Sequence, residues 1–233
     1  MQKGILHAGD RNFFVGCNYW ASHAGTAMWS HWKPEVIDED LRKLAENGLQ
    51  VLRVFPLWPD FQPIDLLYRG GGVPVEYRFG EEALPDDEAG RAGVSKAAMK
   101  RFEEFVGIAE KYNFKLIVGL VTGYMSGRLF VPPALRGKDI LTDKVAIMWQ
   151  VRFVKYFVNA FKRCNTIVAW DLGNECNVMQ FEISREDAWV WTASLSNAIK
   201  ATDGSRPIVS GMHSLTPAGN WTMQDQGELT DIL

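Results

Sequence analysis

Apolar and polar positions along the chain follow two periods, and together they predict a strand-then-helix order. Five apolar runs predict buried strands, at residues 12–19, 49–55, 114–121, 167–170 and 208–211. Between them, apolar residues recur at helical spacing over 34–47, 96–109, 143–163 and 184–202. Residues 231–233 predict the beginning of a sixth strand. Strands that alternate with helices build a parallel sheet with right-handed crossovers.

Helix boundaries are marked by residues with known end preferences. Pro34 begins the first helix at a position that needs no N–H, and Gly48 ends it. Ser95, Thr142 and Ser184 are the expected N-caps of the other three. The segments between these elements are therefore expected to be loops.

The longest such segment, residues 56–93, has no sustained helical or strand period. It holds five of the ten prolines and three consecutive glycines at 70–72, without the Gly-Lys-Ser/Thr of a phosphate loop. A loop this long inside a compact domain is usually functional or disordered. Because it follows the second strand, we expect it to wall one side of a cleft.

Polar side chains follow five different strands: Asn18, Arg53, Thr122, Glu175 and His213. A closed (β/α)₈ TIM barrel brings all such strand ends to one mouth, whereas an open doubly wound sheet spreads them along an edge. A Gly-x-Gly-x-x-Gly fingerprint is absent after the first strand, which disfavours a dinucleotide-binding sheet. We therefore expect an α/β fold in which residues 1–233 form a single barrel domain, with about the first five to six strands present.

Arg53 is the one charged residue in its predicted strand. A buried cation needs a carboxylate partner or a site to serve. Two interpretations follow: a salt bridge internal to the barrel, or a role in the site at the strand end.

The stretch Trp170-Asp-Leu-Gly-Asn-Glu175 carries a family resemblance, which Arg53 and Asn18-Tyr19-Trp20 extend. It resembles the fourth-strand motif of the retaining family 5 glycoside hydrolases, in particular the β-mannosidase-like and β-mannanase-like branch. The resemblance implies that Glu175 is the general acid/base and that Asn174 binds the substrate 2-hydroxyl. It also implies that Arg53 hydrogen-bonds the catalytic nucleophile. A plain alternative is that Asn174-Glu175 only caps the next helix.

Tryptophans in loops are candidates for stacking on sugar rings, because a flat indole suits both packing and carbohydrate binding. The candidates are Trp20, Trp29, Trp32, Trp58 and Trp221, of which Trp20, Trp29 and Trp58 follow predicted strand ends most closely. His213 matches a binding position in the resemblance. Trp149, Trp189 and Trp191 fall on predicted helices and are expected to pack.

The nucleophile of the family is a second glutamate on a seventh strand, which these 233 residues do not reach. Glu182 and Glu228 do not match that position. We expect the chain to belong to a longer catalytic domain, to be inactive alone, and to self-associate through unpaired strand edges.

Composition limits the other possibilities. A net charge of −3 favours neither nucleic acid nor an anionic membrane as a partner, and no run approaches the 18 apolar residues of a membrane span. The first residues lack a signal-peptide core, so a cytoplasmic location is expected. Three scattered cysteines, an odd number, argue against a disulfide framework. We expect no metal and no cofactor.

The predicted reaction is retaining hydrolysis of β-1,4-mannosides or related β-glycans, as oligosaccharides or polysaccharides. Two other functions stay open. A metal-dependent barrel hydrolase would use Asp171, Glu175 and His213, although no His-x-His pair is present. A carbohydrate-binding protein without hydrolytic activity would result if no second glutamate were supplied.

Overall fold

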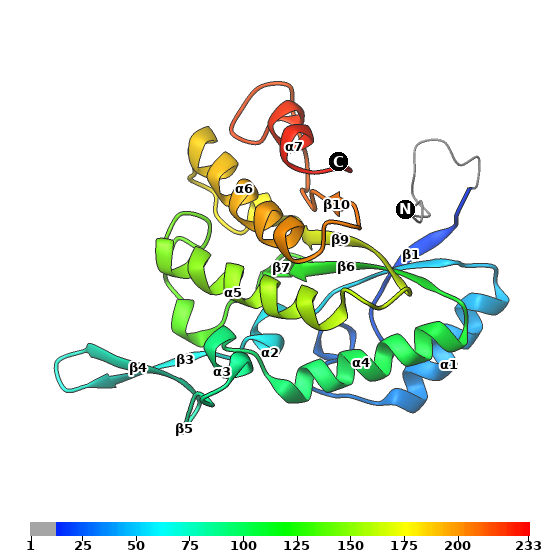
Figure 1. The fold of residues 1–233 in the computed structure, drawn as a ribbon, viewed down its shortest axis with the longest axis horizontal. Helices are drawn as coiled ribbons and strands as arrows, with labels where there is room; N and C mark the ends of the chain where they lie inside the picture. Colours follow the sequence, from blue (N-terminus) through cyan, green and yellow to red (C-terminus); the bar gives the residue numbers. More distant parts are fainter. Residues whose placement is uncertain (1–12) are drawn as a thin grey trace.

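A five-stranded parallel sheet is the centre of the computed structural model, which describes residues 13–233 (Figure 1). Its strands are β1 (Gly16–Tyr19), β2 (Val51–Val54), β6 (Lys115–Val121), β9 (Ile167–Gly173) and β10 (Ile208–Val209). They pair in the order β1-β2-β6-β9-β10, which is also their order along the chain. A doubly wound sheet reverses its order at a switch point, and this sheet does not. The prediction of a barrel arc is therefore confirmed.

Four long helices connect these strands: α1 (Pro34–Glu46), α4 (Lys96–Lys111), α5 (Lys144–Phe161) and α6 (Arg185–Thr202). Pro34 lies in the first turn of α1, and Ser95 and Ser184 cap α4 and α6 with their hydroxyl oxygens. The prediction that Thr142 caps the third of these helices is wrong. Asp143 caps α5 instead, because its carboxylate accepts the N–H groups of both Val145 and Ala146.

The helices pack together on one side of the sheet, α1 beside α4 and α5 beside α6. Aromatic rings fill the space between sheet and helices. Phe157 of α5 contacts Phe102 of α4 with ring centroids 4.8 Å apart, and it also contacts Trp170 of β9. Because the apolar side chains face the helices, the opposite face of the sheet is available for polar residues.

The segment after β2 is more regular than its sequence suggests. It contains α2 (Trp58–Phe61), an antiparallel sheet of β3 (Asp65–Arg69), β4 (Val73–Phe79) and β5 (Glu82–Ala83), and α3 (Glu88–Ala92). The β3-β4 hairpin projects from the body of the molecule (Figure 1). The expectation of an irregular loop is wrong here. Apolar residues alternate along β4, but Pro74 and the adjoining glycines mask that period in the sequence.

The C-terminal segment adds a helix that the sequence pattern missed, α7 (Met223–Leu229), capped by Thr222. After it, Ile232 forms a parallel bridge with Val209 of β10, as expected for the beginning of a sixth strand. The remaining elements are short: η1 (Gly25–Ala27), β7 (Tyr124–Met125), β8 (Arg128–Leu129), η2 (Pro133–Leu135) and η3 (Cys176–Val178). Over residues 13–233, no helix combines the length and apolar character needed to cross a membrane.

Candidate active site

Side chains of β9 alternate between two environments. The indole of Trp170 packs against Phe157 and donates a 2.8 Å hydrogen bond to Asp203 at the end of α6, so it faces the helices. Asp171 comes next in the strand and bonds to Arg53 of β2 across the sheet. Alternation along the strand therefore turns the Trp170 indole away from the face that carries Asp171.

Arg53 is held by three acceptors from the end of β9. Its Nε donates to Asp171 Oδ2 at 2.6 Å, its Nη2 donates to the Gly173 carbonyl at 2.7 Å, and its Nη1 donates to Asn174 Oδ1 at 3.2 Å. The Asp171 side chain has no exposed surface, and that of Arg53 is 25% exposed. Burial raises the pKa of Asp171, and the Arg53 charge opposes the shift. The internal salt bridge, one of the two interpretations of Arg53, is present.

Asn174 is fixed from two directions. Its Oδ1 accepts from Arg53, and its Nδ2 donates to the Tyr124 carbonyl at 3.1 Å. Tyr124 follows β6, the strand beside β9. The amide of Asn174 therefore links the ends of three adjacent strands, β2, β6 and β9.

Glu175 has a left-handed backbone, with φ of 50° and ψ of 46°. Residues other than glycine rarely adopt this backbone conformation, and those that do cluster at functional sites. The residue after Glu175 fixes the turn: the Cys176 N–H donates a hydrogen bond to the Gly211 carbonyl at 3.1 Å. Glu175 does not act as a side-chain cap for the following helix η3.

Two glycines let backbones approach closely behind this turn. A Cβ on Gly173 would lie 2.1 Å from the Val121 carbonyl oxygen of β6. A Cβ on Gly211, which has φ of 67°, would lie 2.4 Å from Asp171 Oδ1. The loop after β10 therefore packs directly on the buried carboxylate.

Aromatic side chains lie beside Arg53, on the side towards β1. Trp20 stacks on Phe55 with centroids 5.5 Å apart, and the Arg53 guanidinium lies 4.7 Å from the Phe55 ring centroid. Asn18 pairs in register with Arg53, and its side chain is exposed. The structure thus brings Asn18 and Trp20 to the same sheet face as Arg53.

Trp29 and Trp58, two expected sugar-stacking residues, are core residues. Both are completely buried. Trp29 donates from Nε1 to the Phe55 carbonyl and stacks on Trp32, while Trp58 donates to Gln62. Their indole faces are covered by protein, so neither is available to a sugar. Both belong to the hydrophobic core, which strand position alone does not reveal.

The other tryptophans also divide by burial. Trp221 is buried against Trp191, and Trp149 is buried as predicted. Trp189 was expected to pack, yet it is 41% exposed on α6. Trp20 and Trp32 are the candidates of intermediate exposure.

His213 is exposed and lies beyond β10. Its backbone N–H donates to Asn177 Oδ1 at 2.8 Å, and its ring Nδ1 lies 2.9 Å from Ser214 Oγ. Asn177 belongs to η3, the turn that directly follows Glu175. The loop of His213 is therefore joined to the segment that carries Glu175.

The proposed metal set of Asp171, Glu175 and His213 is not supported by the geometry. Asp171 is occupied by Arg53 and the Gly173 N–H. Within residues 13–233, the structure shows no group of three or more His, Cys, Asp or Glu side chains placed to hold a metal ion. Glu182 and Glu228 are exposed, on the turn before α6 and on α7 respectively.

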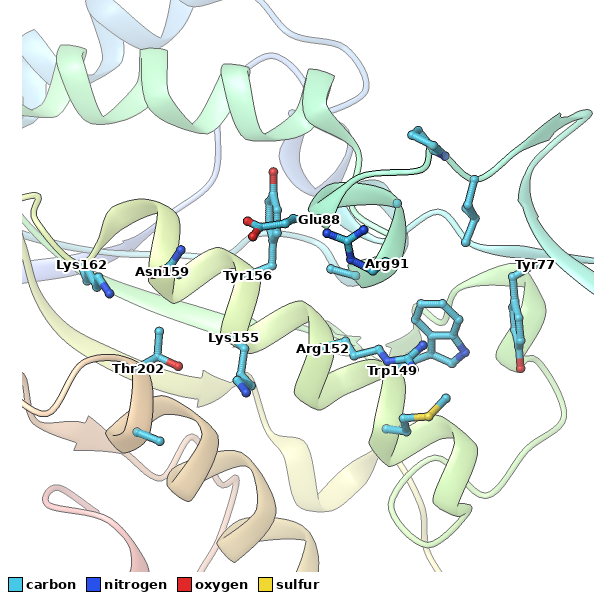
Figure 2. Close-up of a pocket in the computed structure, with 16 residues that line it drawn as sticks. Tyr77, Glu88, Arg91, Trp149, Arg152, Lys155, Tyr156, Asn159, Lys162 and Thr202 are labelled. Atoms are coloured by element: carbon cyan, nitrogen blue, oxygen red, sulfur yellow. The ribbon is translucent and has the colours of Figure 1, made fainter.

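A groove of about 930 Å³ lies elsewhere, along the outer face of α5 (Figure 2). Trp149, Arg152, Lys155, Tyr156 and Lys162 are among its lining residues. It shares no residue with the cluster at the strand ends, so we do not assign the active site to it.

Asp171 is the site residue that sequence reasoning missed as a partner of Arg53. The available signal was its position between the helix-facing Trp170 and Leu172, which predicts the opposite face for Asp171. A buried carboxylate and a partly buried cation on the same face of a sheet are expected to pair.

Known proteins resemble this chain in sequence and in fold. No family model matches the chain. It is 22% identical over 215 residues to mannan endo-1,4-β-mannosidase F of Aspergillus clavatus, covering 87% of this chain and 44% of that protein. The exo-β-1,4-mannosidase Op5Man5 from Opitutaceae bacterium strain TAV5 matches with a TM-score of 0.71 at 24% identity, covering 88% of this chain and 32% of that one. A GH5_18 protein from Streptomyces cattleya in complex with Manβ1-4GlcNAc matches with a TM-score of 0.69 at 18% identity, covering 85% and 44%.

The chain is thus similar over most of its length to family 5 mannanases and mannosidases, which confirms the resemblance inferred from its motifs. The solved structures also confirm the barrel type of fold. The chain spans less than half of the length of each of these three proteins.

Proposed function

We propose that the protein is a retaining glycoside hydrolase acting on β-1,4-linked mannosides, with Glu175 as the general acid/base. The observation that carries this proposal is the placement of Glu175 in a left-handed turn at the carboxyl end of the fourth strand, directly after Asn174. In barrel enzymes the carboxyl ends of the strands form the catalytic face.

The substrate class rests on the relatives. The names of two of them specify a mannan endo-1,4-β-mannosidase and an exo-β-1,4-mannosidase, and the structure of the third holds a Manβ1-4GlcNAc disaccharide. The two names and the bound disaccharide all refer to a β-linked mannose. We therefore assign β-mannosides before β-glucosides, as oligosaccharides or as a polysaccharide.

Retaining hydrolysis requires two carboxyl groups about 5 to 5.5 Å apart. Glu175 would first protonate the leaving oxygen and then, as its conjugate base, activate the water that releases the sugar. The family pattern places the nucleophile on a seventh strand, and we assign that role to neither Glu182 nor Glu228. Asn174 would hydrogen-bond the 2-hydroxyl as the sugar ring flattens.

Replacement of Glu175 by Ala in a full-length, active form of the protein tests the assignment. Hydrolysis of mannosides with poor leaving groups should slow by roughly 10²–10⁴-fold, because they need a proton in the transition state. Substrates with activated leaving groups should lose less in the first step, and azide should restore turnover of the second. Equal losses for both kinds of substrate, without azide rescue, would contradict the assignment.

A second measurement examines the retaining mechanism. A 2-fluoro mannoside with an activated leaving group should trap a covalent glycosyl-enzyme, visible as a mass increase of one fluorinated sugar. A protein that only binds carbohydrate would show no such increase.

A further inference from the structure

Asp171 lies behind the candidate active site and connects its parts. Each of its oxygens has a different partner: Oδ2 accepts from Arg53 Nε, and Oδ1 accepts from the Gly173 N–H at 2.9 Å. Through Arg53 the hydrogen bonds continue to the side-chain oxygen of Asn174. A fully buried carboxylate is thus two hydrogen bonds away from the amide at the strand end.

The guanidinium group transmits orientation as well as charge. It is planar and rigid, so fixing Nε on Asp171 and Nη2 on the Gly173 carbonyl also fixes the direction of Nη1. Nη1 is the nitrogen that meets Asn174.

Arg53 in turn decides which way the Asn174 amide faces. An amide group has an acceptor side and a donor side of nearly equal shape, and only its partners distinguish the two orientations. Arginine has donors alone, so it can bond only the oxygen of Asn174. The NH₂ group must then lie on the other side, where the Tyr124 carbonyl accepts one of its two hydrogens.

We propose that Asp171 is a positioning residue: by holding Arg53, it keeps the Asn174 amide turned so that its NH₂ group is presented to the 2-hydroxyl of the substrate. This inference rests on the proposed function, in which Asn174 contacts that hydroxyl. Asp171 itself touches no substrate, since its side chain is completely buried.

The Arg53 side chain is partly exposed to solvent, so the Asp171 carboxylate is needed to keep it in the site. It is 25% exposed, and its other contacts are the neutral Gly173 carbonyl, the Asn174 amide and the Phe55 ring. Within residues 13–233, none of these groups supplies a counter-charge. Without Asp171, the cation can turn towards water, or towards the nucleophile that the family resemblance places beside it, and release the amide of Asn174.

The test compares an aryl β-mannoside with its 2-deoxy analogue in a full-length, active form of the protein. Asp171→Asn should lower kcat and kcat/KM on the mannoside together, by roughly tenfold or more, because the lost interaction acts in the transition state. The 2-deoxy substrate lacks the hydroxyl and should change much less. A smaller folded fraction lowers both rates equally, so the ratio of the two effects does not depend on stability.

A double-mutant cycle localises the effect. In an Asn174→Ala background, Asp171→Asn should cause no further loss of discrimination between the two substrates, because coupled residues are non-additive. Arg53→Lys is the second variant, used in particular if Asp171→Asn does not fold. A lysine can pair with Asp171 but cannot bridge three acceptors, and it should reduce discrimination in the same way.

Equal losses on both substrates would overturn the inference and leave Asp171 with a structural role alone. Full additivity with Asn174→Ala would overturn it as well. Failure of the proposed function has a different signature: the natural protein would not hydrolyse the mannoside, or Glu175→Ala would not show the leaving-group dependence and azide rescue described above, whatever the Asp171 variants do.

Discussion

Glu175 combines an unfavourable backbone with the position expected of a catalytic carboxyl. A left-handed conformation costs a residue with a Cβ roughly 1–2 kcal/mol, and it persists only where the surroundings enforce it. Here the Gly211 carbonyl binds the next N–H, and Gly173 allows β6 to approach. The strain is thus balanced by the packing of two loops, and the carboxyl group is directed by the turn rather than by a regular strand.

Asp60 is a second residue whose surroundings oppose its charge. Its Oδ2 is buried and has no hydrogen-bond partner among residues 13–233. Burial raises the pKa of Asp60 from an ordinary 3.8 to about 6, although Arg101 and His31 oppose the shift. Because the folded pKa lies above the unfolded value, folding favours the protonated carboxyl. That contribution is complete below about pH 4 and is lost as the pH rises through about 6.

Asp60→Asn should therefore remove a pH dependence of stability. Its free energy of unfolding relative to the natural protein should increase between pH 4 and pH 7, since asparagine has no charge to bury. Urea unfolding followed by tryptophan fluorescence at several pH values measures this difference. Glu35→Gln, at an exposed position of α1, is the control. A difference between Asp60→Asn and the natural protein that stays constant with pH would refute the prediction.

The elements that follow each strand determine which aromatic residues can meet a sugar. The segment between β1 and α1 folds inward, so Trp29 joins Phe61, Phe102 and Phe105 in the core. Trp20 comes earlier in the same segment and stays on the polar face of the sheet, stacked on Phe55. Two tryptophans nine positions apart therefore have different roles.

Trp29→Ala should cost roughly 3–5 kcal/mol of stability, the range for deleting a large aromatic side chain from a core. Trp189→Ala, at an exposed position of α6, should change stability by less than about 0.5 kcal/mol. Chemical denaturation of both variants gives the comparison. A Trp29→Ala variant as stable as the Trp189→Ala control would show that the indole is not packed as described.

The whole molecule is an open arc of parallel strands with helices on one face. Among residues 13–233, no strand pairs with the outer edge of β1, and Phe13 and Val15 beside it are 87% and 47% exposed. An apolar strand edge of this kind is a template for pairing with another chain.

The 233-residue chain by itself should therefore self-associate in a concentration-dependent way. Val15→Lys should weaken the association, because a charge at an edge strand opposes pairing. Met148→Lys, on α5, provides a matched charge away from that edge and should leave it unchanged. Sedimentation velocity over a range of concentrations measures both. A monomer at all concentrations would contradict the prediction.

Local sequence patterns were sufficient for much of this protein. Apolar runs and helical periods placed the five strands and four long helices, and the motif ending in Asn174-Glu175 located the candidate site. These features depend on residues close together in the chain, and the physical rules that connect them act over one or two turns. The family resemblance, carried by the same short motifs, was confirmed by the comparisons.

Tertiary structure decided the features that depend on distant residues. Arg53 and Asp171 are 118 positions apart, and only strand pairing brings them within 2.6 Å. Whether a tryptophan is buried depends on which segment covers it, and that separates Trp29 and Trp58 from Trp20. The hairpin of β3 and β4 was hidden because proline and glycine obscured its alternation. The period of apolar residues in the sequence predicts the face on which a side chain lies. Its partner on that face depends on how the whole sheet packs.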